Sequence, residues 1–329
     1  MDTLPPIHLP PAHRRPLLPV LCSATSLVVS GVGISCLNKW VFLGCAYPYP
    51  LFLSALHMLT SAFFNAALLR LGLTCSRPGE PPARLPSSAT PRVLLLSLTF
   101  CASVACGNLA LRHAELAFAQ MLYAANPLVT MGLSHALLRG PGYGAVEYAA
   151  MLPVCLGASL SVLGEVHFDP TGCLYICITM VLRGVKSIQQ GVLLQEENID
   201  TILLLYVMSL PSFFLLFCGT LLFESGALWE LLARSSPCLW ISLLLSCASS
   251  VLYNLSSFFV VKQTSAVTLH LLGNLVVLGN VVASQALFGG PVSLLGVAGT
   301  TLTLSGVLLY QNSASVASLV ASWKERQKR

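Results

Sequence analysis

The chain has 329 residues, of which 55% are hydrophobic and only 9% are charged, and its mean hydropathy is +0.79. Soluble proteins carry about 25% charged residues, so this composition excludes a soluble globular domain and predicts an all-α polytopic membrane protein. The net charge of +5 is attributed to loops that face the cytosol rather than to nucleic-acid binding.

Apolar stretches separated by glycine, proline and charged residues predict ten transmembrane helices. The first follows Arg14 and Arg15 and is interpreted as an uncleaved span rather than a signal peptide. We expect a short interfacial helix after Gln311, which ends in the basic cluster from Trp323 to Arg329. The ten predicted spans are 18–43, 50–74, 92–113, 115–138, 144–165, 171–195, 200–223, 238–262, 265–288 and 292–311.

The lysines and arginines in the loops and at the ends of these spans predict how the chain crosses the bilayer. With both termini in the cytosol, the cytosolic segments hold twelve basic residues and the opposite segments hold two, Arg112 and Arg234. Because cytosolic loops are enriched in Lys and Arg, ten spans with both termini cytosolic fit better than nine or eleven.

The last two spans form a charge-free tract of 61 residues between Lys262 and Lys324, which contains a partial copy of an earlier segment. Residues 284–291 (SQALFGGP) match residues 134–141 (SHALLRGP) at five of eight positions, at an offset of 150. Cys-Ala-Ser and Asn-Leu also recur between residues 101–109 and 247–255, at an offset of 146. These matches predict an internal duplication.

The duplication pairs spans one to five with spans six to ten. Since five is odd, the second half enters the membrane from the opposite side, which gives the inverted repeat of many secondary transporters. The expected organisation is a cytosolic N-terminal tail, two five-helix repeats and a basic cytosolic C-terminal tail, at residues 1–17, 18–165, 171–311 and 312–329.

Two cations deep in the sixth span are the main candidates for a binding site. Arg183 and Lys186 are three residues apart, so they share one helix face. They lie about 8–12 residues from either end of the span, too deep to reach water easily. Charges inside a bilayer usually face a cavity or a partner. We therefore expect a cationic cavity for an anionic ligand, unless the pair binds helix-end carbonyls or Glu196 and Glu197.

Other polar residues are weaker candidates. Lys39 lies near the end of its span, where snorkelling beside Trp40 explains it equally well. His270 and Asn274 share one face of the ninth span, although a lone His is more often a hydrogen-bonded core residue than a proton carrier. Pro127 is expected to break the fourth span and to free backbone groups there.

The sequence contains no catalytic signature that would predict an enzyme. HExxH, GxSxG and Walker motifs are absent. The twelve cysteines form no CxxC pair and no zinc spacing, and most lie in apolar runs, so they are interpreted as free. We expect no cofactor and no metal. Without an ATPase domain, transport would be driven by a gradient or by exchange.

Several segments resemble the triose-phosphate transporter family within the drug/metabolite transporter superfamily, with the E branch of solute carrier family 35 closest. These segments are Asn38–Phe42, Leu182–Gln190 with Leu193–Glu196, Leu203–Tyr206 with Pro211–Ser212, and Thr264–Thr268 through Gly273–Asn274. The resemblance implies ten helices, an inverted five-plus-five repeat, and exchange of phosphorylated metabolites or nucleotide sugars.

The chain departs from that family at two positions. Phosphate-exchanging relatives carry a Lys shortly before the proline of span four, at about Tyr123 here. They also carry a Lys-Arg pair after the Gly-Asn of span nine, where this chain has Leu275–Leu278. Arg and Lys are the usual phosphate ligands, so exchange of triose phosphate for phosphate is not expected.

The working hypothesis is a secondary-active exchanger of a small organic anion in the Golgi or endoplasmic-reticulum membrane, working by alternating access. Its candidate substrate-binding residues are Arg183, Lys186, Lys39, His270, Asn274 and Tyr123. The expected partners are a small anionic metabolite and the lipid bilayer, with a homodimer left open and no nucleic acid. The alternative is a membrane interaction or regulatory protein that keeps a transporter fold but does not transport.

Overall fold

The computed structural model describes residues 17–73, 85–113, 119, 122–138, 143–162, 170–234, 236–288 and 294–327, and all regular secondary structure in these ranges is helical. Six of the described helical segments are long and apolar enough to cross a bilayer. They are Leu17–Gly44, Pro50–Arg70, Ser87–Ala110, Pro170–Glu196, Thr201–Phe223 and Pro237–Gln263. The chain is therefore a multi-pass membrane protein, as predicted.

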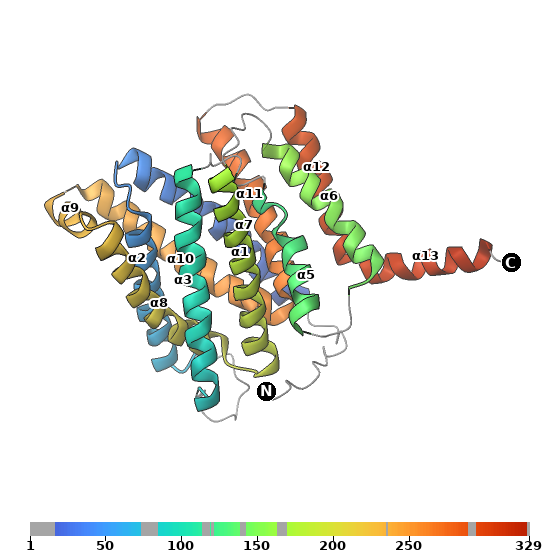
Figure 1. Cartoon of the computed structure of the whole chain (residues 1–329), viewed down its shortest axis with the longest axis horizontal. Helices are drawn as coiled ribbons and strands as arrows, with labels where there is room; N and C mark the ends of the chain where they lie inside the picture. The colour runs from blue at the N-terminus through green and yellow to red at the C-terminus, as the bar shows by residue number, and fades with distance from the viewer. Residues whose placement is uncertain are drawn as a thin grey trace.

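The helices begin and end within a few residues of the predicted spans, except in the fourth span, which is only partly described. Their bounds are α1 Leu17–Lys39, η1 Trp40–Gly44, α2 Pro50–Arg70, η2 Ser87–Ala89, α3 Thr90–His113, α5 Asn126–Leu138, α6 Ala145–Val162, α7 Pro170–Gly191, η3 Val192–Glu196, α8 Thr201–Phe223, α9 Ala227–Ala233, α10 Pro237–Gln263, α11 Ala266–Phe288, α12 Leu294–Gln311 and α13 Ser313–Gln327. The short helix α9 was not predicted. The expected helix after Gln311 forms as α13 and projects from the bundle (Figure 1).

Several helix contacts in the bundle come in matching pairs. α1 packs against α10 and α11, whereas α7 packs against α3 and α5. α3 packs against α8 in the same way that α10 packs against α2, while α2–α8 and α6–α12 contact each other directly. Each of these contacts made by an earlier helix thus has a counterpart made by a later one.

The two kinked helix ends η1 and η3 share their backbone geometry at an offset of 152 residues. Both are single π-turns that follow a long helix. Each is followed by one left-handed residue, Ala46 with φ 49° and Asn198 with φ 50°. In each, an amide after the turn donates back to the helix over 3.1 Å, Tyr47 N to Val41 O and Ile199 N to Leu193 O. Single π-turns of this kind are frequent at functional sites.

The apolar side chains divide between the interior and the outer surface of the bundle. The largest buried cluster joins α1, α2, α8 and α10 through residues such as Leu27, Met58, Met208 and Phe258. Many large hydrophobic side chains are exposed along the same helices, for example Leu222, which is 77% exposed. Soluble monomers rarely expose wide apolar patches, so this surface suits contact with lipid.

Candidate functional site

The helix α7 places its two cations against aromatic rings. The Cζ atom of Arg183 lies 4.3 Å from the centroid of the Tyr123 ring. The Nζ atom of Lys186 lies 5.7 Å from the centroid of the Phe100 ring, on α3. Both cations are partly buried. Aromatic faces attract cations most strongly where water is excluded, so the rings hold both charges without neutralising them.

Within the described part of the chain, no carboxylate pairs with either of these cations. The ion pairs described there join Arg92 to Glu197 and Arg234 to Glu230. The alternative that Glu197 neutralises the α7 cations is therefore wrong, because its carboxylate binds Arg92 at the end of the bundle. Glu196 is exposed next to it. The positive charge of α7 is thus left for another group to balance.

His270 on α11 is hydrogen-bonded to the same face of α7. Its Nε2 atom lies 3.0 Å from the Ser187 hydroxyl, and that hydroxyl donates to the Arg183 carbonyl over 2.9 Å. The Ser187 oxygen is then left to accept the Nε2 proton. This hydrogen bond joins α11 to α7 at Ser187, which is the residue after Lys186.

Asn274, one turn after His270, binds a backbone group that a broken helix leaves free. The structure has a turn at Ala124 and Ala125, and α5 begins at Asn126. The predicted break at Pro127 is confirmed, since proline is tolerated in the first turn of a helix. The Asn274 amide donates to the Ala124 carbonyl over 2.9 Å. This contact joins α11 to the break, next to Tyr123.

Lys39 is exposed at the last residue of α1. The structure therefore brings together Arg183, Lys186 and Tyr123, with His270 and Asn274 on the neighbouring helix, and places Lys39 at a helix end. Phe100 was not predicted, because a phenylalanine in an apolar span gives no indication of a functional role.

Buried polar atoms without a hydrogen-bond partner lie on the helices that form this site. In the described residues they include Tyr123 Oη, Asn126 Oδ1, Thr130 Oγ1, Gln189 Oε1, both amide atoms of Gln190, and Asn108 Nδ2. A Cβ atom on Gly107 would lie 3.8 Å from both Arg183 Nη2 and Tyr123 Oη, which places α3 against the pair. Buried polar groups are normally bonded, so these atoms suit a polar ligand or water.

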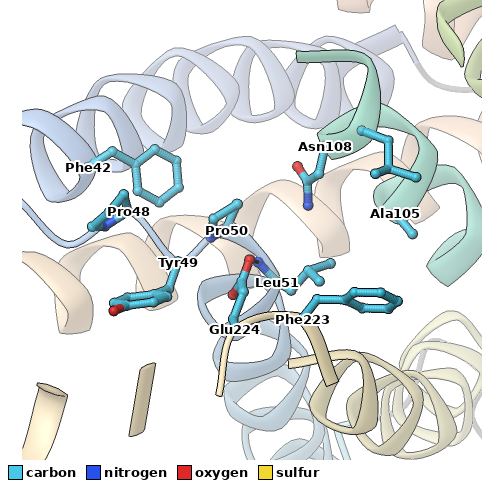
Figure 2. A pocket seen from close by; sticks show the side chains of 10 residues that line it. Phe42, Pro48, Tyr49, Pro50, Leu51, Ala105, Asn108, Phe223 and Glu224 are labelled. Carbon is cyan, nitrogen blue, oxygen red and sulfur yellow. Dashed lines mark hydrogen bonds between the residues drawn. The ribbon is translucent and has the colours of Figure 1, made fainter. Parts of the chain in front are cut away.

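A cavity of about 560 Å³ opens at the end of the bundle where α1, α3 and α8 finish and α2 begins (Figure 2). Its walls are mostly apolar and include Phe42, Tyr49, Leu51 and Phe223, with the polar groups of Asn108 and Glu224. Asn108 follows Gly107, which adjoins Arg183. The same turn of α3 therefore contributes to the cavity wall and to the packing around Arg183.

Comparisons with known proteins place the chain in one family. A model of the Triose-phosphate Transporter family matches residues 27–311. The chain is 46% identical to solute carrier family 35 member E4 of Homo sapiens, over 97% of this chain and 86% of that protein. It is 32% identical to UDP-uronic acid transporter 1 of Arabidopsis thaliana, over 85% of this chain and 91% of the relative.

More distant matches extend this picture. GDP-mannose transporter GONST5 of Arabidopsis thaliana is 28% identical, over 85% of this chain and 81% of its own length. One crystal structure shares the fold at a TM-score of 0.69 and 15% identity, over 88% of this chain and 96% of the other. These named relatives are carriers, and the chain is a transporter-family protein rather than an enzyme. With the family model covering most of its length, the protein belongs to the triose-phosphate transporter family.

Proposed function

We propose that this protein is an exchanger that carries a small organic anion, such as a sugar phosphate or a nucleotide sugar, across a Golgi or endoplasmic-reticulum membrane. One observation carries the proposal: Arg183 and Lys186 rest on aromatic rings inside the bundle, without a carboxylate in the described residues. An anionic group would balance this charge, and charge-assisted hydrogen bonds from Arg and Lys are the usual way to bind phosphate.

The same arrangement favours a ligand in which the anionic group is attached to a polar group such as a sugar. Hydroxyl groups of a sugar need several donors and acceptors, and the unpaired amides and hydroxyls around Arg183 offer both. In the ninth span, the positions after Asn274 remain apolar, and Val276 and Leu278 are buried. This favours a ligand other than the triose phosphate and phosphate pair, and two named relatives carry nucleotide sugars.

Alternating access rests on two repeats that pack as inverted copies, residues 18–165 and 171–311. Two observations favour this organisation. The helix contacts come in matching pairs, and η1 and η3 repeat the same turn 152 residues apart. In such folds the substrate site lies near the midplane between the repeats, where α7, α11 and the break before α5 meet.

The two ends of the bundle differ, as one conformation of an alternating-access carrier requires. Phe42 of η1 lines the cavity, whereas Leu194, 152 residues later in η3, is 1% exposed and belongs to the main core cluster. Gln195 closes that second end by donating to the Thr264 carbonyl over 3.0 Å. With both termini in the cytosol, the open end faces the lumen.

A ligand-stabilisation screen on purified protein tests the binding site. A ligand at 100 times its dissociation constant stabilises a protein by about 2.7 kcal/mol, so at least one nucleotide sugar or sugar phosphate should raise the Tm. Lys186→Gln should remove that shift and abolish uptake of the same compound into proteoliposomes. Lys324→Gln, in the tail, is the control and should keep both. An unchanged shift in Lys186→Gln would remove Lys186 from the site.

A second candidate function is a membrane interaction or regulatory protein that no longer transports. The aliphatic residues from Leu275 to Leu278 favour it, because phosphate-binding side chains are expected there in the family. In that case none of the nucleotide sugars and sugar phosphates in the screen would change the Tm, and wild-type proteoliposomes would take up none of them.

A further inference from the structure

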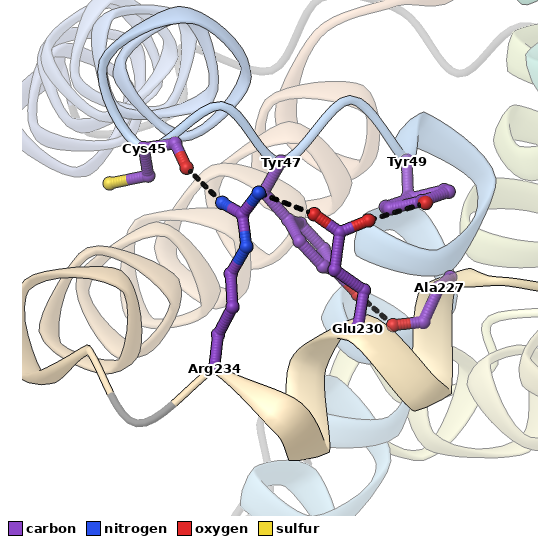
Figure 3. A network of polar contacts seen from close by, with 6 residues as sticks. All are labelled: Cys45, Tyr47, Tyr49, Ala227, Glu230 and Arg234. Atoms are coloured by element: carbon purple, nitrogen blue, oxygen red, sulfur yellow. Dashed lines mark hydrogen bonds and ion pairs between the residues drawn. The ribbon is translucent and has the colours of Figure 1, made fainter.

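The connection between α1 and α2, residues 45–49, is fastened to the segment around α9 (Figure 3). The Cys45 carbonyl accepts a hydrogen bond from Arg234 over 2.7 Å, and the Tyr49 hydroxyl donates to Glu230 over 2.6 Å. The buried Tyr47 hydroxyl donates to the Ala227 carbonyl over 2.8 Å. We call residues 45–49 the first elbow. These bonds hold it against the start of α10, which follows Arg234.

Within this contact the Cys45 side chain reaches α10. Its Sγ atom lies 3.9 Å from the Ser242 hydroxyl. Cys238 is four residues before Ser242, so it lies on the same face of α10, one turn away. Helical side chains lean toward the N-terminus of their helix, which brings the Ser242 hydroxyl over the turn of Cys238. Burial raises the pKa of the Cys45 thiol, and the nearby Cys238 thiol adds to the rise; neither cysteine is in a disulfide.

We propose that Cys45 and Cys238 form a reversible disulfide that joins the first elbow to α10. The two cysteines come from different halves of the chain, and the Cys45 sulfur lies within 3.9 Å of a residue one helical turn from Cys238, which is the approach that a disulfide between them requires. Disulfides persist in oxidising compartments. The compartment is the one part of this inference that rests on the proposed function, which places this end of the bundle in the lumen.

The chemistry requires a disulfide oxidant, such as oxidised glutathione. Cys238 is the exposed thiol and Cys45 is partly buried. The oxidant reaches the exposed thiol more easily, so the Cys238 thiolate attacks it first. This step forms a mixed disulfide and releases one glutathione thiolate. The Cys45 thiolate then attacks the Cys238 sulfur, forms the protein disulfide and releases the second glutathione. Two electrons pass to glutathione, and each protein thiol loses one proton.

The disulfide would fix one wall of the cavity. Pro48 and Tyr49 of the first elbow both line it. A covalent bond from Cys45 to α10 would hold that wall in the arrangement described above. Oxidation should therefore slow any transport cycle that moves the elbow, and a reductant should restore it.

The test uses the full-length protein in lipid nanodiscs, incubated with oxidised glutathione or with dithiothreitol. Free thiols are then blocked with N-ethylmaleimide, and the protein is digested for mass spectrometry. We expect a linked Cys45–Cys238 peptide after oxidation, absent after dithiothreitol, together with two fewer labelled thiols. Cys45→Ser and Cys238→Ser should each remove the linked peptide. Cys218→Ser, at an exposed cysteine of α8, should keep it.

Absence of the linked peptide in oxidised wild-type protein overturns the proposal, as does equal labelling of Cys45 and Cys238 in both conditions. The result is independent of transport. If the disulfide forms but wild-type protein neither binds nor carries any anion, the proposed function fails and the disulfide site stands. If uptake occurs and no disulfide forms, the proposed function stands and the disulfide proposal fails.

Discussion

At the scale of single residues, the cation–ring pairs decide how selective the site is. Arg183 presents a planar guanidinium to the Tyr123 ring, and a lysine at that position would keep the charge but lose the planar stack and the paired donors. Cation–π contacts contribute about 2 kcal/mol where water is excluded, and 1.4 kcal/mol corresponds to a tenfold change in affinity. Arg183→Lys should therefore weaken anion binding about tenfold or more, measured as the concentration that gives a half-maximal Tm shift.

Tyr123→Phe separates the contribution of the ring from that of the hydroxyl. It keeps the ring under Arg183 and removes a hydroxyl that has no hydrogen-bond partner in the described structure. If the ring orients the cation, Tyr123→Phe should bind the anion far better than Arg183→Lys. Stronger loss in Tyr123→Phe would show instead that the hydroxyl contacts the ligand.

The amide of Asn274 compensates for the broken helix before α5. Its removal leaves the Ala124 carbonyl without its partner, and an unpaired buried polar group costs about 1–3 kcal/mol. Asn274→Leu should lower the free energy of unfolding by that amount, read as a fall in Tm in detergent. Asn312→Leu is the control, because Asn312 donates to Leu308 at an exposed site. Equal losses in both variants would contradict this role of Asn274.

Some of these residues could be identified from the sequence, and others could not. The positions of Arg183 and Lys186 in an apolar span were sufficient to single them out, because a charge in a bilayer is rare. Their ring partners were not predictable, since Phe100 resembles any other apolar residue and the contact depends on how α3 packs against α7. Asn274 was expected to face a cavity, but its amide binds the Ala124 carbonyl, a contact that depends on where the helix breaks.

At the scale of helices, α2 and α8 begin in different ways. The N-terminus of α8 is capped by its own preceding residue, as Asp200 accepts from the amides of Ile202 and Leu203. The N-terminus of α2 is capped by Glu224, which follows α8 and accepts from Leu51 N over 3.1 Å and Phe52 N over 3.0 Å. Glu224 also lines the cavity. The Glu224 cap therefore ties the start of α2 to the end of α8 on the open side.

The charge on Glu224 should be important for this tie. A carboxylate at a helix N-terminus gains from the helix dipole and from charge-assisted hydrogen bonds, and a lost cap costs about 0.5–2 kcal/mol. Glu224→Gln should destabilise the protein by an amount in that range, measured by thermal unfolding. Glu230→Gln is the control, because the lost ion pair with Arg234 is partly exposed and such pairs contribute about 0–1 kcal/mol, while a glutamine can still accept the hydrogen bond from the Tyr49 hydroxyl. A smaller loss in Glu224→Gln than in Glu230→Gln would contradict the cap.

Helix ranges were predictable from hydropathy because the bilayer requires long apolar segments. The features that shape the cavity were not predictable from hydropathy. The π-turn of η1 begins inside an apolar run, and α9 has only seven residues. Both depend on contacts between segments far apart in the chain, such as the bond from Tyr47 to Ala227, which no local pattern records.

At the scale of the whole molecule, α6 and α12 form a close pair at one side of the bundle (Figure 1). Glycines bring their backbones close together, and apolar side chains of both helices pack beside them. A Cβ atom on Gly306 would lie 2.8 Å from Val154 N and 2.9 Å from Ala150 O, and one on Gly157 would lie 2.6 Å from Gly299 O. Small residues at such contacts let membrane helices approach closely. This pair joins the fifth helix of the first proposed repeat to the fifth helix of the second.

Gly306→Ala should therefore separate α6 from α12. Its methyl group would meet backbone atoms of α6, which cannot rotate away as a side chain can. Overpacking of this kind costs about 1–3 kcal/mol, so the Tm should fall. Gly132→Ala on α5 is the matched control, since no atom lies within 4 Å of the added methyl group. In a helix that exchange stabilises by up to about 1 kcal/mol, so the Tm of the control should hold or rise. Because the two substitutions are chemically identical, their opposite signs would come from packing alone, and a fall of equal size in both would rule out a close α6–α12 contact.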